Sequence, residues 1–231
     1  MRQKRTLTIY VEGGGDYRKL LQDCRQAFSK FFEEAGLPSR SFSVEACGSR
    51  QDAYDDFCTA LAAGEKAILL VDSEELVNFD RQTNMPIQAW QHLAGRPNDS
   101  WKRPAGSTDL QAHLMVPTME AWFLADREKL ANYYRGKYNR GAFNENPLPK
   151  RADVEQVSKD DLNDALKAAT KGNDIKGVYN KGNHSFDILA TLDPKKVAAA
   201  SYHAKRLLCH LKNALKANAT MQWLDCTDLA T

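Results

Sequence analysis

Two stretches of the sequence indicate the fold: Ile9-Tyr10-Val11-Glu12-Gly13-Gly14-Gly15-Asp16 and Ile68-Leu69-Leu70-Val71-Asp72-Ser73-Glu74-Glu75. Each is a short β-branched or leucine-rich run that ends abruptly in carboxylates. This pattern is typical of a buried parallel strand that delivers acids to the C-terminal edge of a sheet. Open α/β sheets place their sites at that edge. The three glycines after Glu12 remove side chains where the chain must turn, so backbone or a ligand could approach the acids closely.

Alternating strands and helices are predicted around these two runs. The strands are expected at residues 6–12, 42–46 and 67–71. Apolar residues at helical spacing predict one helix that ends before Gly36, and Ser49 is expected to cap a second. The order β-α-β-α-β with short connections favours right-handed crossovers and a parallel sheet. We therefore predict an α/β, Rossmann-like fold with helices flanking a mainly parallel sheet.

The remainder of the chain is predicted to be mostly helical. Between Asp72 and Asp109 the sequence is long and irregular, as functional loops often are, with one short helix expected to open at Pro86. A fourth strand is expected at residues 113–116, followed by a helix that Thr118 can cap. Further helices are expected from Ser158 and, as one long final helix, from Asp193. We predict an α/β domain at residues 1–135 and a helical C-terminal region, packed on it, at residues 136–231.

Composition narrows the class of protein. A chain of 231 residues can bury one substantial core, and a net charge of +2 gives no general affinity for polyanions. The part after Gly136 is slightly basic, which suits either nucleic acid or solvated helix faces. The five cysteines form no CxxC pair and are predicted to be reduced thiols: Cys24, Cys47, Cys58, Cys209 and Cys226. Without a long apolar run, a cytoplasmic protein with no membrane partner is expected.

Several carboxylates are expected to converge if the first and third strands are neighbours. Glu12, Asp72 and Glu74, with Glu75 as a further candidate, offer hard oxygen ligands that suit Mg²⁺ or Mn²⁺. A bound cation would relieve their mutual repulsion. The alternative is that these acids are helix caps and solvent-facing loop residues. Gly15 is followed by Asp16 rather than by Lys and Ser or Thr, so a phosphate-binding P-loop is not predicted.

Other polar residues are candidates for the same site. Glu120 lies among residues that are predicted to be buried, where a carboxylate is costly unless it is paired or bound to metal, although it can equally be a helix-dipole partner. Lys181, with Asn183 and His184, lies on a polar turn and could neutralise a phosphate or donate a proton; the alternative is a simple helix cap. The pair Lys205 and Arg206 could also offset phosphate charge. By contrast, His203 and His210 lack a third ligand, so we predict that they are core or surface residues.

These residues carry a resemblance to a known fold. Val-Glu-Gly-Gly-Gly-Asp at 11–16 and Leu-Val-Asp-Ser-Glu-Glu at 70–75 resemble the Toprim domain of type II topoisomerases, bacterial primases and OLD-family nucleases. More narrowly, Val-Pro-Thr-Met-Glu-Ala-Trp-Phe-Leu-Ala-Asp at 116–126, Lys-Gly-Asn-His at 181–184 and His-Ala-Lys-Arg-Leu-Leu at 203–208 resemble the Toprim-like domain-of-unknown-function family 4276.

The resemblance implies a site and an activity. Glu12 matches the Toprim acid after the first strand, and Asp72 matches the first aspartate of the pair after the third. Glu74 departs from the second aspartate by one methylene. The implied protein is a Mg²⁺- or Mn²⁺-dependent nuclease acting on DNA or RNA, with metal on Glu12, Asp72, Glu74 and Glu120, and catalytic help from Lys181.

The resemblance also implies partners. An anti-phage defence role, an ATPase partner and a homodimer are expected from it. The alternative is a non-catalytic Toprim-fold binding or regulatory subunit of an ATPase complex, which the departure at Glu74 would suit.

Overall fold

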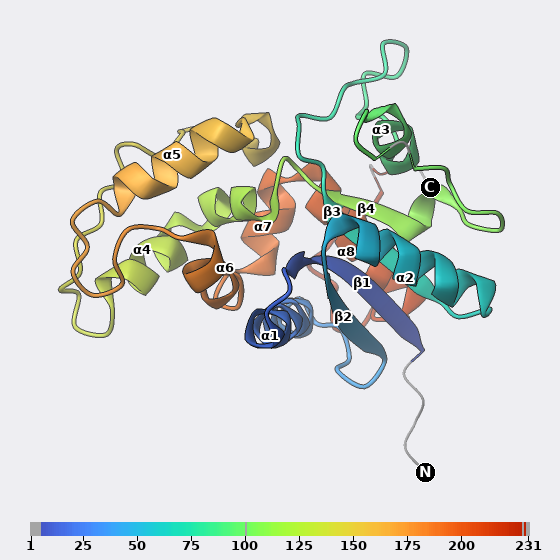
Figure 1. The fold of residues 1–231 in the computed structure, drawn as a ribbon, viewed down its shortest axis with the longest axis horizontal. Helices are drawn as coiled ribbons and strands as arrows, with labels where there is room; N and C mark the ends of the chain where they lie inside the picture. The colour runs from blue at the N-terminus through green and yellow to red at the C-terminus, as the bar shows by residue number, and fades with distance from the viewer. Residues whose placement is uncertain (1–5, 100, 228, 230–231) are drawn as a thin grey trace.

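A four-stranded parallel sheet forms the centre of the protein (Figure 1). The computed structural model describes residues 6–99, 101–227 and 229. The strand order is β2-β1-β3-β4, and each neighbouring pair is parallel. The strands are β1 (Leu7–Gly14), β2 (Phe42–Gly48), β3 (Ala67–Asp72) and β4 (Ala112–Met115). The predicted α/β fold with a parallel sheet is therefore confirmed, and β1 and β3, whose ends carry the acids, are direct neighbours.

Helices connect the strands and make up most of the chain after β4. The α-helices are α1 (Arg18–Glu34), α2 (Arg50–Ala62), α3 (Ala89–Gly95), α4 (Arg127–Arg135), α5 (Lys159–Ala169), α6 (Lys181–Leu189), α7 (Pro194–Ala200) and α8 (Tyr202–Ala214). The described residues also form three 3₁₀ segments, η1 (Asp109–Gln111), η2 (Met119–Asp126) and η3 (Val154–Gln156). None of the helices in the described part of the chain is both long and apolar enough to span a bilayer.

Both faces of the sheet are covered, which explains why every residue of β3 is buried. Successive strand residues point to opposite faces. Ile68 and Leu70 belong to the core with α1, η2 and the C-terminal helices, whereas Leu69 and Val71 belong to the core with α2 and α3. A strand buried on both faces needs a continuous apolar run rather than an alternating one. The run Ala67–Val71 meets that need, and Asp72 is the point at which it stops.

The glycine turn between β1 and α1 is dictated by close packing. Gly14 has φ +92°, and a Cβ there would lie 2.8 Å from the Cα of Leu21 on α1. A side chain at this position would therefore be both conformationally strained and in collision with the helix backbone. By contrast, a Cβ on Gly15 (φ +52°) would meet nothing within 4 Å. The turn lets α1 begin immediately beyond the acid of β1.

Several local predictions need correction. The final helix is broken at Ser201, whose hydroxyl oxygen accepts from the Ala204 N–H and so starts α8 anew. The Thr118 side chain makes no capping hydrogen bond, and the segment after it is the 3₁₀ helix η2 leading into α4. Helix α3 begins at Ala89 rather than at Pro86.

Two of the cysteines are not free thiols. Cys209 on α8 is joined to Cys226 by a disulfide with a Cα–Cα separation of 5.8 Å. The prediction that all five are reduced was therefore wrong. A pairing across 17 residues depends on how the C-terminal segment folds back along α8, which the spacing of cysteines does not reveal.

The C-terminal helices share one core with the sheet. Leu166 of α5, Ile188 of α6 and Leu207 of α8 belong to the same buried cluster as Ile9 of β1 and Phe28 of α1. Figure 1 shows α4, α5 and α6 together at one side of the sheet, while α8 lies against it. The division into domains 1–135 and 136–231 stays a prediction.

Candidate metal centre

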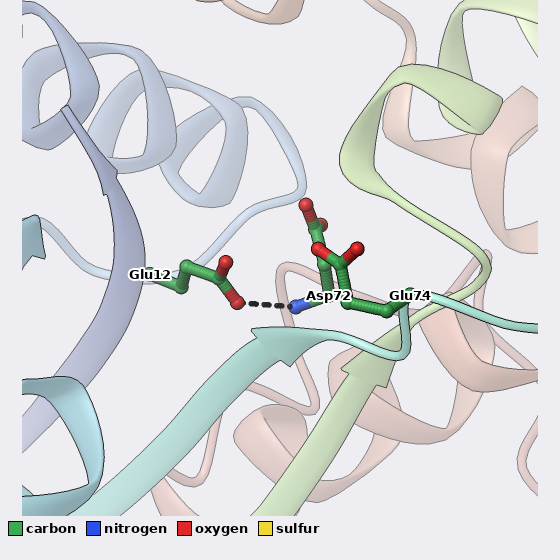
Figure 2. Close-up of side chains that lie close together, drawn as sticks. All are labelled: Glu12, Asp72 and Glu74. Atoms are coloured by element: carbon green, nitrogen blue, oxygen red, sulfur yellow. Dashed lines mark hydrogen bonds between the residues drawn. The ribbon is translucent and has the colours of Figure 1, made fainter. Parts of the chain in front are cut away.

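Three carboxylates meet at the C-terminal edge of the sheet. Glu12 lies near the end of β1, Asp72 ends β3, and Glu74 follows two residues later. One ligand oxygen from each lies within 4.8 Å of the others, as Figure 2 illustrates. Because β1 and β3 are paired and parallel, their last residues emerge side by side. The sheet register therefore brings together acids that are 60 residues apart in the chain.

Asp72 is the most deeply buried of the three acids. Only 4% of the residue is exposed, and Oδ1 accepts a 2.8 Å hydrogen bond from the backbone N–H of Met119 at the start of η2. The pKa of Asp72 is raised to about 8, chiefly by burial; the like charges of Glu12 and Glu120 contribute to this rise, and Lys181 opposes it. The folded chain therefore leaves this carboxylate short of compensating positive charge.

Glu12 is fixed by its neighbours. Its Oε2 accepts from the backbone N–H of Asp72 at 3.1 Å (Figure 2) and from Arg50 Nη1 at 2.9 Å. Burial raises the pKa of Glu12, and the guanidinium of Arg50 opposes that rise. Asp99 in turn accepts from Arg50 Nη2 at 2.6 Å and from Arg96 Nε at 2.7 Å. The carboxylate of Glu12 is thus oriented by an arginine that is itself held by a buried ion-pair network.

Arg50 is a site residue that the sequence reasoning missed. Its Nη1 also donates to the backbone carbonyl of Asp72, so one guanidinium ties the ends of β1 and β3 together. A signal was present, because Arg50 is the first residue of α2, directly after the Ser49 cap. A cation is unfavourable near a helix N-terminus unless an acid compensates it.

Glu74 is held in an unusual backbone conformation. Its φ of +68° is in the left-handed region that non-glycine residues seldom adopt, and its N–H donates to the Pro117 carbonyl at 2.8 Å. The side chain turns back towards Asp72 (Figure 2) and pairs with Lys159 at the start of α5. Glu75 does not join the group, because it is 71% exposed and pairs with Arg96. Glu75 is therefore excluded from the candidate ligand set.

Lys181 links Asp72 to the fourth candidate acid. Its Nζ lies 3.4 Å from Asp72 Oδ2 and 3.4 Å from Glu120 Oε2. Although burial lowers the pKa of Lys181, its acidic neighbours more than offset this and raise it, so the ammonium stays charged. Glu120 is buried, also accepts from Ser185 Oγ at 3.1 Å, and lies outside the three-acid group. As a candidate ligand it is one step removed, behind Lys181.

A cavity of about 180 Å³ opens beside these residues. Glu120, Lys181 and Lys159 line it, together with Tyr179 and apolar residues of α5. Lys159 pairs with Glu74 and Lys181 with Asp72, so the two lysines lie between these acids and the cavity, which Asp160 of α5 also lines.

A family model described as "Domain of unknown function (DUF4276)" matches residues 11–212. The chain belongs to this family. The match includes Glu12, Asp72, Glu74, Glu120 and Lys181. No curated protein and no solved structure matches the chain.

Other polar candidates in this DUF4276 chain have structural partners elsewhere. His184 Nδ1 accepts from the Asn180 N–H at 3.1 Å and bonds Tyr134 Oη at 3.0 Å, so it braces the first turn of α6. His203 pairs with the buried Glu155 at 2.8 Å. His210 bonds His113 at 3.0 Å. The prediction that His203 and His210 are core or surface residues agrees with these contacts.

The predicted phosphate role of Arg206 needs correction. Arg206 is buried, and its guanidinium donates to the carbonyls of Asp109 and Ala112. Ala112 begins β4, so this arginine lies at the edge of the sheet opposite to the acids. Its position in the helical stripe resembled that of an exposed residue, but a cation that donates to several carbonyls can be buried.

The donor set of the candidate centre suits a hard divalent cation. Glu12, Asp72 and Glu74 supply carboxylate oxygens only, which Mg²⁺ and Mn²⁺ prefer over nitrogen and sulfur ligands. A cation between the three would also offset the burial and the repulsion by Glu12 that raise the pKa of Asp72. The geometry can therefore hold a metal ion and present it towards the cavity with two lysines beside it.

Proposed function

We propose that this protein is a Toprim-like, Mg²⁺- or Mn²⁺-dependent nuclease that hydrolyses phosphodiester bonds in DNA or RNA. The observation that carries the proposal is the convergence of Glu12, Asp72 and Glu74 at the ends of two neighbouring parallel strands. The arrangement of a Glu after the first strand and paired acids after the third is the one implied by the resemblance to Toprim domains. The DUF4276 match itself names no activity.

The lysines beside the acids support a phosphate substrate. The side chains of Lys159 and Lys181 are 45% and 59% exposed, so each can reach an incoming anion while remaining near the carboxylates. In a site that contains only acids, a phosphodiester would be repelled. Two ammonium groups at the rim of the cavity offset that repulsion and can stabilise the charge that develops on the phosphate oxygens.

The roles of the residues follow from this geometry. Glu12, Asp72 and Glu74 would hold the metal, which when bound polarises phosphate oxygens and lowers the pKa of water. Arg50 keeps Glu12 oriented, and Met119 N–H keeps Asp72 oriented. A water oxygen attacks phosphorus, the bond to the leaving oxygen breaks, and that oxygen takes up a proton. Burial raises the pKa of Glu12, which makes its carboxylate a better acceptor for the proton of the attacking water.

Metal binding and cleavage test the proposal together. Mn²⁺ titration by calorimetry, followed by a Mg²⁺ and Mn²⁺ cleavage screen with labelled DNA and RNA, should give binding and cleavage in the wild type. Both should be lost in Asp72→Asn and Glu12→Gln. Glu75→Gln is the matched control, because it removes one carboxylate from the same loop outside the group, and it should retain both. Cleavage by both site variants at the wild-type rate would overturn the proposal.

A second candidate is a non-catalytic Toprim-fold subunit. The favouring observation is Glu74, which stands where the resemblance implies an aspartate and whose carboxylate is engaged by Lys159. This function predicts nucleic-acid or partner binding with no cleavage under either metal. The homodimer, the ATPase partner and the role in phage defence remain predictions from the resemblance, and co-purification of an ATPase with the tagged protein from its own cells would test that association.

A further inference from the structure

A basic and aromatic surface lies on the helical side of the molecule, away from the sheet. We call it the basic-aromatic surface and define it by Tyr133, Lys137, Tyr138, Arg140, Ile175 and Lys176. The first four come from the end of α4 and the loop that follows it, and the last two come from the loop that precedes α6. Figure 1 shows these two loops on the same side of the molecule.

The surface combines tyrosine rings with cations. Tyr138 is 72% exposed, and both Lys137 Nζ and Arg140 Cζ lie within 6 Å of its ring centroid, at 5.7 and 5.6 Å. Lys176 Nζ lies 4.5 Å from the ring centroid of Tyr133. Of the five cation–π pairs in the described part of the chain, these are three. One exposed ring, one half-buried ring and three cations thus lie on one surface, and rings beside cations are the pattern that binds nucleic-acid strands.

The two loops are held together by a buried side chain. Asn173 Nδ2 donates to the carbonyls of Tyr134 at 3.0 Å and Ala142 at 2.8 Å, while its Oδ1 accepts from the N–H groups of Ile175 and Lys176. Four hydrogen bonds from one amide fix the loop after α4 against the loop before α6. The surface is therefore preorganised rather than formed by two independent loops.

The surface adjoins the element that carries Lys181. Tyr134, next to Tyr133, bonds His184 in the first turn of α6, and the rings of Tyr133 and His184 are 6.0 Å apart. Lys181 is the first residue of the same helix and lies 3.4 Å from Asp72. The hydroxyl of Tyr133 donates to the carboxylate of Asp187, so the polar end of this tyrosine is already hydrogen-bonded. The surface is therefore connected through α6 to the lysine that contacts Asp72.

We propose that the basic-aromatic surface binds an unpaired stretch of nucleic acid and guides it to the acids; this inference rests on the proposed nuclease function and names its substrate class. Lysine and arginine neutralise backbone phosphates, and exposed tyrosine rings stack on bases. A duplex buries its base faces in its own stack and offers only phosphates. Tyr138, whose ring is exposed and flanked by two cations, is the residue that distinguishes the two substrates.

The test measures binding without cleavage. Fluorescence anisotropy in EDTA with a labelled 20-nucleotide oligothymidylate, an oligouridylate of the same length and a labelled duplex separates the surface from the metal centre. Tyr138→Ala should weaken binding of both single strands about tenfold and leave duplex binding unchanged, because one stacked base is lost. Lys137→Ala/Arg140→Ala should weaken all three ligands and reduce the salt dependence.

The control variant Arg40→Ala/Lys66→Ala removes two exposed cations just before β2 and β3, at the edge of the sheet opposite to the acids. It should bind all three oligonucleotides as the wild type does. Single-strand binding that is unchanged in Tyr138→Ala, or an equal loss for duplex and single strands, would overturn the inference. A preference for one of the two single strands would support it and identify DNA or RNA as the substrate. Mn²⁺ binding should be normal in every surface variant, so failure of this inference is distinguished from failure of the nuclease proposal.

Discussion

Replacing Asp72 by asparagine separates the penalty of burying a carboxylate from its role in holding a cation. The pKa of Asp72 is raised from 3.8 to about 8 in the folded chain, chiefly by burial. A raised pKa means that the folded state holds the proton more tightly than the unfolded state does. The protonation of Asp72 therefore contributes fully to the free energy of unfolding below pH 3.8, and this contribution is lost as the pH rises towards 8.

The magnitude follows from the distance between the two pKa values. Each pH unit in that interval corresponds to about 1.4 kcal/mol, so the whole interval has an upper limit of roughly 6 kcal/mol. Asparagine keeps the shape and can still accept from the Met119 N–H, but it loses the pairing with Lys181. We expect Asp72→Asn in EDTA at pH 8 to be more stable than the wild type by on the order of 3 kcal/mol. At pH 4 the two proteins should be nearly equal.

A bound cation should reverse the order. At a Mn²⁺ concentration of about 100 times Kd, the wild type gains about 2.7 kcal/mol of unfolding free energy, whereas the variant gains none. Urea unfolding monitored by circular dichroism measures the free energy of unfolding of both proteins under four conditions, at pH 4 and pH 8 with EDTA or Mn²⁺. The reasoning is refuted if Asp72→Asn is less stable than the wild type in EDTA at pH 8, or if Mn²⁺ stabilises both proteins equally.

Three further predictions follow. Mn²⁺ affinity of the wild type should rise about tenfold per pH unit between pH 6 and 8, because Asp72 must lose its proton to bind metal, and calorimetry should detect the released proton. Gly14→Ala should destabilise the fold by about 3 kcal/mol in urea unfolding, because its Cβ would strike the backbone of α1, whereas Gly15→Ala should lose only about 1 kcal/mol. Reduction of the Cys209–Cys226 disulfide, or Cys226→Ser, should lower the free energy of unfolding by about 3 kcal/mol for a loop of this length, and an unchanged melting temperature in dithiothreitol would contradict that expectation.

The ion-pair network behind Glu12 gives the site its rigidity. Arg50 contacts Glu12, Asp99 and the backbone at the end of β3, and Arg96 holds Asp99 from the other side. Buried charges arranged in this way are expensive to break one at a time. Glu12, a candidate ligand, and the end of β3 are thus held in place by Arg50, so we expect a cation to bind there with little reorganisation.

The parallel sheet and the three acids at its C-terminal edge, Glu12, Asp72 and Glu74, could be predicted from the sequence alone. Ala67–Val71 is apolar at every position and stops at Asp72, so a strand buried on both faces could be recognised locally, together with the edge at which it ends. The glycine turn after Glu12 was recognisable for the same reason, because local backbone geometry demands glycine at Gly14. These features depend on residues that are near one another in the chain.

The set of polar side chains that surround these acids depends on the tertiary structure. Arg50 and Glu12 meet through the packing of α2 beside β1, and Lys159 reaches Glu74 from 85 residues away. The pattern of its helix predicts that Arg206 is exposed, yet Arg206 is buried among carbonyls at the edge of the sheet opposite to the acids. The Cys209–Cys226 disulfide likewise depends on the path of the C-terminal segment. Such contacts depend on how whole helices and strands pack together, so the spacing of residues along the chain does not predict them.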